Sequence, residues 1–139
     1  MNWKEKCFFT LAEENMFENS WHKTRFKELL DCYKDSPFLS KGLCKCMYLS
    51  AWDEEHFRVM LEILTMMSLG KETDTTEMRI NGDALAKEQT DDEYYIYQLS
   101  NAFLDGIPFQ PGETANISPE FVYIIQRALK VSEIIDNLT

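Results

Sequence analysis

The sequence has little glycine and no glycine-rich motif. Only five glycines occur among 139 residues, and the patterns Gly-x-Ser-x-Gly, Gly-x-x-x-x-Gly-Lys and Gly-x-Gly-x-x-Gly are absent. Phosphate-cradling loops and the sharp turn that carries a hydrolase serine depend on such patterns. The sequence therefore predicts no nucleotide site and no serine nucleophile, and we expect no catalytic and no cofactor-binding residue.

Residues that bind metals are also few. The chain has two histidines, His22 and His56, and four cysteines, of which Cys44 and Cys46 are the closest pair in sequence. Structural zinc sites usually take cysteines in Cys-x₂₋₄-Cys pairs, and two residues that are two apart on a helix point to nearly opposite sides. No His-Glu-x-x-His motif occurs. We therefore expect no metal site, a packed His22 on an apolar stripe, and His56 either in the core or on the surface.

Long apolar runs are missing. The longest, such as Phe121–Ile125, are far too short to span a bilayer, and the N-terminus lacks the extended apolar region of a signal peptide. These absences predict a soluble protein that resides in the cytoplasm and has no membrane partner. Because disulfides are uncommon in that compartment, we expect free thiols.

Basic charge is scarce as well. Fourteen Lys and Arg residues face 24 Asp and Glu residues, which gives a net charge of -10 and argues against direct binding to nucleic acid. The imbalance is uneven along the chain. Residues 72–93 hold eight acidic and two basic side chains, whereas residues 21–48 hold six basic and three acidic ones. This polarity points to a protein partner rather than to a reaction.

Helical spacing of apolar residues fills most of the sequence. It predicts an all-α fold, with one domain over residues 1–139 formed by an irregular bundle of five or six helices. The segment Phe57–Leu69 is apolar on most sides and is expected to be the central helix. Ser36-Pro37 and Ser118-Pro119 each predict a helix start. Asn81-Gly82 favours a minor β-hairpin near residues 77–86, although a short helix from Asp83 is an equal alternative.

The acidic segment and the tyrosines beside it form the candidate partner-binding site. Tyr94 and Tyr97 are three residues apart, on the side of their helix away from its apolar stripe, and tyrosine is favoured at interface hot spots. An equal alternative is that this helix is buried on two sides. Lys41 and Lys45 form a basic strip, which follows a cluster of Lys23, Arg25 and Lys27. The strip is either a solvated helix face or a docking site for an acidic surface. The residues expected to contact a partner are Asp91, Asp92, Glu93, Tyr94, Tyr97, Glu72, Asp74 and Glu77.

The function that these features predict is that of a non-enzymatic, acidic protein-binding module. In its sharper form, the module is a small inhibitor that imitates the charge of nucleic acid and blocks a basic, nucleic-acid-binding partner. One alternative is a small enzyme or metal-binding helical bundle that uses its His and Cys residues. Another is a structural helical protein that self-associates, with the basic helices of one copy against the acidic segment of another.

Overall fold

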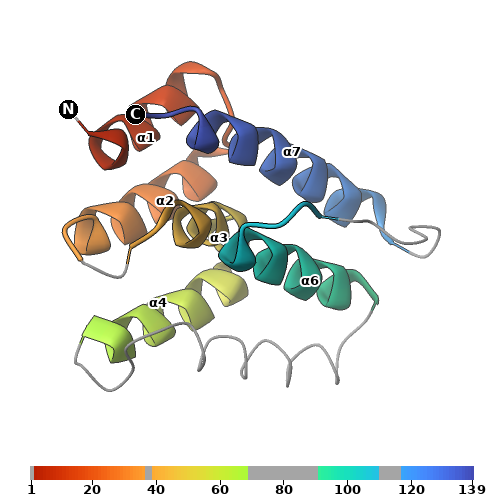
Figure 1. The fold of residues 1–139 in the computed structure, drawn as a ribbon. Coiled ribbons are helices and arrows are strands. Elements are labelled where there is room, and N and C mark those ends of the chain that lie inside the picture. Colours follow the sequence, from red (N-terminus) through yellow and green to blue (C-terminus); the bar gives the residue numbers. More distant parts are fainter. Residues whose placement is uncertain (1, 37–38, 69–90, 110–116) are drawn as a thin grey trace.

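The chain folds into a bundle of helices. The computed structural model describes residues 2–36, 39–68, 91–109 and 117–139, and these ranges contain helices and no strand (Figure 1). The all-α prediction is therefore confirmed, and the predicted hairpin near residues 77–86 lies outside the described residues. The helices are α1 (Trp3–Glu13), α2 (Ser20–Tyr33), α3 (Lys41–Ala51), α4 (Glu54–Ser68), α6 (Asp91–Asp105) and α7 (Pro119–Asp136).

Polar caps fix where several helices begin. Asn2 forms a capping box with Glu5 at the start of α1, and the side chain of Asn19 accepts a hydrogen bond from the backbone of α2. At α7 Ser118 is the N-cap and a proline follows it, as predicted. The predicted start at Ser36 is wrong, because α3 begins after Ser40, whose side chain accepts from the backbone N–H of Leu43.

The central helix is α3. It contacts α2, α4, α6 and α7, and every side chain from Leu43 to Leu49 is buried. The expectation that Phe57–Leu69 forms the centre is thus wrong. Within the described part of α4, Met60 and Leu64 are buried, whereas Phe57, Val59 and Leu61 are only partly buried. The sequence misleads here because α3 mixes Lys, Gly, Cys and Ser with its apolar residues, which hides how completely it is enclosed.

Close approach of α3 to α6 depends on a glycine. A Cβ atom on Gly42 would lie 2.4 Å from the backbone oxygen of Phe103. A larger residue would push the two helices apart, so Gly42 is needed for their packing. Among the described residues, no helix is long and apolar enough to cross a membrane.

Candidate functional site

The N-terminal ends of α4, α6 and α7 meet at one end of the bundle. His56 of α4 lies 2.7 Å from Glu93 of α6, and the carboxylate of Asp92 accepts a 2.8 Å hydrogen bond from the backbone N–H of Ser118, which caps α7. In Figure 1 the N-terminal ends of α6 and α7 both lie on the right. Each helix start carries acidic side chains, which complement the positive end of its dipole. We call this region the acidic end; its described carboxylates are Asp53, Glu54, Glu55, Asp92, Glu93 and Glu120.

His56 lies between two of these carboxylates. Its Nδ1 is 2.7 Å from Oδ2 of Asp53, and its Nε2 is 2.7 Å from Oε2 of Glu93. Burial alone would lower the pKa of His56, but the hydrogen bonds and charges of Glu93 and Asp53 outweigh it and raise the pKa to about 9. The ring is therefore an imidazolium that donates from both nitrogens. The same hydrogen bonds to His56 outweigh burial at Asp53 and lower the pKa of that carboxyl group.

This arrangement defines what His56 can do. An imidazolium with both N–H groups donated has no lone pair to accept a proton or to bind a metal. The ring is 23% exposed, and its centroid lies 5.9 Å from that of Trp52, whose own ring meets Phe121 of α7 edge to face at 5.0 Å. His56 thus joins α4 to α6, and Trp52 extends the junction to α7. Its role here is to hold the acidic end together.

The structure divides the predicted contact residues into groups. Asp92 and Glu93 are engaged within the chain, by Ser118 and His56 respectively, so their carboxylates support the fold. Tyr94 is 47% exposed and available at the surface, and Tyr97 is partly exposed. Asp91 begins α6. The side chain of Asp91 and all of Glu72, Asp74 and Glu77 lie outside the described residues.

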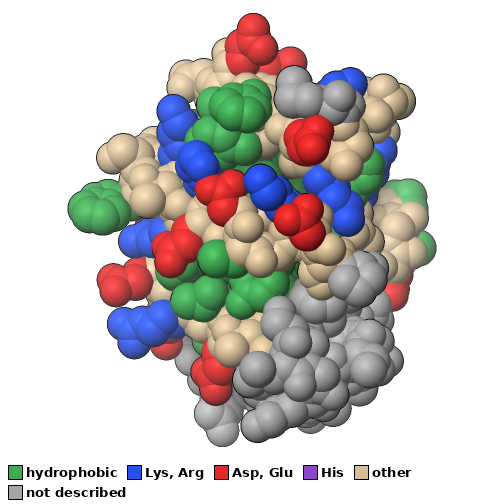
Figure 2. All heavy atoms as spheres, turned by 90° about the vertical axis from the view of Figure 1, so that its left-hand side faces the viewer, with side chains coloured by type: hydrophobic (Ala, Val, Ile, Leu, Met, Phe, Trp, Pro, Cys, Tyr) green, Lys and Arg blue, Asp and Glu red, His purple; other side chains and the backbone are tan. Residues whose placement is uncertain are grey.

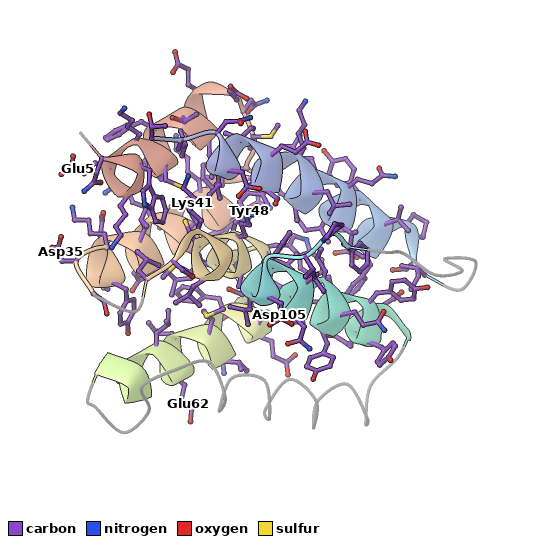
Figure 3. All side chains as sticks on the ribbon, viewed as in Figure 1. Glu5, Asp35, Lys41, Tyr48, Glu62 and Asp105 are labelled. Carbon is purple, nitrogen blue, oxygen red and sulfur yellow. The ribbon has the colours of Figure 1, made fainter. Side chains whose placement is uncertain are left out.

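Basic side chains near helix ends bind backbone carbonyls. Arg25 donates to the oxygens of Ala51 and Trp52 at the end of α3, at 3.3 and 3.4 Å. Lys41 donates to the oxygens of Asp136 and Leu138 at the end of α7, at 3.3 and 2.7 Å; Figure 3 labels Lys41. These two cations therefore interact with the negative ends of helix dipoles and do not neutralise carboxylates on the surface.

Lys45 of the predicted basic strip also makes its contacts within the chain. Lys45 is only 9% exposed, lies 2.7 Å from the carboxylate of Asp136, and has its ammonium 5.7 Å from the ring centroid of Phe103. Together with the bonds that Lys41 makes to α7, this contact shows that Lys41 and Lys45 do not form a solvated helix face. These two lysines attach α3 to the C-terminal end of α7. Lys23 and Lys27, from the cluster before the strip, are exposed, and the docking of an acidic surface there stays a prediction.

As a consequence, acidic side chains outnumber basic ones more strongly on the described surface than in the sequence as a whole. Among the described residues, thirteen acidic side chains are exposed, compared with four basic ones, Lys23, Lys27, Arg58 and Lys130. One of the four, Arg58, lies 3.6 Å from Glu54. The described surface is therefore strongly acidic, and its acidic side chains extend well beyond the predicted segment.

A second polar cluster is buried under the α1–α2 connection. Nε2 of His22 donates to the backbone carbonyl oxygen of Tyr48 at 2.8 Å. The backbone N–H of Glu18 donates to Nδ1 of His22 at 3.2 Å. Burial is the main cause that lowers the pKa of His22 to about 4, so the ring is neutral. Tyr48, labelled near the middle of Figure 3, donates to the Met16 oxygen, and burial raises the pKa of its hydroxyl. The packed His22 that the sequence predicts is confirmed.

Three of the four cysteines are buried. The sulfur atoms of Cys7 and Cys44 lie 3.5 Å apart, and the thiol of Cys46 donates to the backbone oxygen of Ser100 at 3.5 Å, while Cys32 is exposed. Although the first two thiols touch, no Cα atom of α1 comes within 8 Å of one in α3, a separation too large for a relaxed disulfide. Across the described ranges, no group of three or more His, Cys, Asp or Glu side chains is arranged to hold a metal.

Known proteins add no further guidance. No family model, no curated protein and no solved structure matches the chain. Sequence reasoning found the acidic residues but not the meeting of the three helix starts. The available signal was the acidic first turn in each of the three helices, and that signal does not say which turns come together.

Proposed function

We propose that the protein is a non-enzymatic binding module that recognises a basic surface on a protein partner through its acidic end. The main support is the charge distribution: thirteen exposed acidic side chains against four exposed basic ones in the described part of the chain. A one-sided field of this kind steers association with an oppositely charged partner and disfavours acidic ones.

Three exposed carboxylates and one exposed ring are the contact groups that we propose. Glu54, Glu55 and Glu120 are exposed, and Tyr94 offers a half-exposed aromatic ring near the same helix starts. Tyrosine buries a large area at low entropic cost, which suits the centre of an interface. Asp92 and Glu93 then act indirectly, because they hold α6 in place against Ser118 and His56.

For the partner class we favour a nucleic-acid-binding protein. Such proteins carry surfaces built to bind phosphate through Lys and Arg. A carboxylate-rich surface presents the same sign of charge, so it can compete for that site.

The test is a pull-down at low and moderate salt, followed by surface plasmon resonance with the partner it returns. We expect Glu54→Lys/Glu55→Lys to slow association strongly and to reduce its dependence on salt, since charges at an interface rim act on encounter. Tyr94→Ala should instead speed dissociation.

A matched control changes the net charge equally at another place. Glu28→Lys/Asp35→Lys alters two exposed acids of the α2 region, and Asp35 lies at the left edge of Figure 3, away from the N-terminal ends of α6 and α7. The control should have a clearly smaller effect. Equal losses in both double variants would show that only net charge matters, and unchanged binding in the first would remove the acidic end from consideration.

A further inference from the structure

One surface of α1 and α2 combines exposed aromatic and basic groups. Phe9 is 65% exposed and packs edge to face against Phe8, with ring centroids 5.7 Å apart. The ammonium groups of Lys23 and Lys27 lie 5.9 and 5.6 Å from the centroid of the Phe8 ring. We call Phe8, Phe9, Lys23 and Lys27 the aromatic–lysine patch. Figure 2 shows the side of the molecule where α1 begins, and in its upper part hydrophobic, basic and acidic side chains lie next to one another.

The patch is unusual for this molecule. Lys23 and Lys27 are two of only four exposed basic side chains in the described ranges. They are one helical turn apart and lie against the same ring, so they present two ammonium groups beside an exposed apolar surface. Lys27 also pairs with Asp31 at 2.6 Å, but both side chains are about half exposed, and an exposed pair of this kind contributes little and exchanges easily.

We propose that the aromatic–lysine patch docks on the acidic end of a second copy of this chain. Charge complementarity is the reason. The two ammonium groups and the exposed ring of the patch suit a surface that has carboxylates beside an aromatic ring. The acidic end has such groups, namely Glu54, Glu55, Glu120 and the half-exposed ring of Tyr94. In this contact Phe9 is covered, and Lys23 and Lys27 face carboxylates of the other copy. The net charge of -10 on each copy opposes association at long range, but salt screens that repulsion beyond roughly 8 to 10 Å at physiological ionic strength.

The contact joins two different surfaces, so it is heterologous. Each copy in a pair keeps one unused patch and one unused acidic end, and the association grows by adding further copies head to tail. It would also cover the groups proposed above to bind a foreign partner. The inference goes beyond that proposed function and does not need it to hold.

The experiment uses sedimentation velocity on the purified chain alone, over a wide range of concentration. One variant disables the patch, Phe9→Ser with Lys23→Gln and Lys27→Gln, and another disables the acidic end, Glu54→Gln with Glu55→Gln. All these side chains except that of Phe9 are polar, and all are exposed. Circular dichroism and the melting temperature serve to confirm that both variants fold like the wild type.

We expect the wild type to form species that grow with concentration and each variant alone to stay monomeric. An equal mixture of the two variants should form one-to-one dimers that do not grow, because only one complementary pair of surfaces remains. A monomeric wild type, an association that persists in either variant, or a mixture that stays monomeric would each overturn the inference. No partner protein is present, so a monomeric wild type leaves the proposed function to its own test.

Discussion

Replacing Glu93 by Gln removes one of the two carboxylates that hold the imidazolium of His56. In the folded protein the pKa of His56 is raised from its ordinary value of 6.5 to about 9. At about 1.4 kcal/mol per pKa unit, the surroundings of His56, in which the two carboxylates outweigh burial, stabilise the fold by a net of roughly 3 kcal/mol wherever His56 is charged in both states. Glu93 is the more strongly interacting partner, so Glu93→Gln should cost about 1.5 to 2 kcal/mol near neutral pH.

The dependence on pH gives this prediction a definite sign. Between 6.5 and about 9 the folded protein holds a proton on His56 that the unfolded chain has released, so the free energy of unfolding falls as the pH rises through this window. His22 acts in the opposite direction. Its pKa of about 4 lies below its ordinary value of 6.5, so stability falls as the pH drops between these values. The histidines alone therefore place the maximum of stability near pH 6.5.

Proton NMR of the two histidine rings and urea denaturation across this range measure both effects. We expect the His56 ring to titrate near the raised value in the wild type and at lower pH in Glu93→Gln, whose stability should also fall less steeply in alkali. Glu54→Gln is the control, because Glu54 lies on α4, the helix of His56, and its carboxylate side chain is 70% exposed. If His56 titrates near 6.5 in the wild type, or if Glu93→Gln is as stable as the control, then Asp53 and Glu93 do not hold His56 as an imidazolium.

Three further predictions concern packing and thiols. Gly42→Ala should lower the free energy of unfolding by about 1 to 3 kcal/mol, because its Cβ would meet the Phe103 backbone oxygen; a neutral effect in urea denaturation would contradict the close contact of α3 with α6. Leu64→Ala should cost about 2 to 5 kcal/mol and Leu61→Ala clearly less, since Leu64 is fully buried and Leu61 is not; equal losses would be inconsistent with this burial. An aromatic disulfide reagent should modify Cys32 quickly and the other three thiols only after denaturation, and fast reaction of more than one thiol would show that the core opens readily.

Most helix positions were predictable because they follow from local chemistry, although the start of α3 was misplaced at Ser36. Apolar spacing and side-chain caps act within a few residues of one another, so the α7 start at Ser118-Pro119 and the packed face of α2 with His22 are visible in the sequence. The choice of central helix was not local. The burial of α3 depends on contacts with four other helices. One of them, α7, supplies Asp136, which pairs with Lys45 although the two residues lie far apart in the sequence.

The candidate site was predictable in composition and not in geometry. Acidic residues at helix starts are visible in the sequence, but an ion pair between His56 and Glu93 joins positions that are 37 residues apart. The same limit applies to Lys41, whose partners are carbonyl oxygens near the end of α7. A backbone carbonyl is present at every residue, so no side-chain pattern marks the ones that accept from a distant lysine.

Because some basic side chains bind backbone carbonyl groups, the stability of the fold and the negative charge of the surface depend on different residues. Arg25 and Lys41 stabilise the ends of α3 and α7 without neutralising an exposed acid. Most exposed acids, in turn, have no described part in holding the helices together. Mutation can therefore redraw the pattern of negative charge over much of the surface at little cost in stability. The surface charge of a protein built in this way can change in evolution while its helices stay where they are.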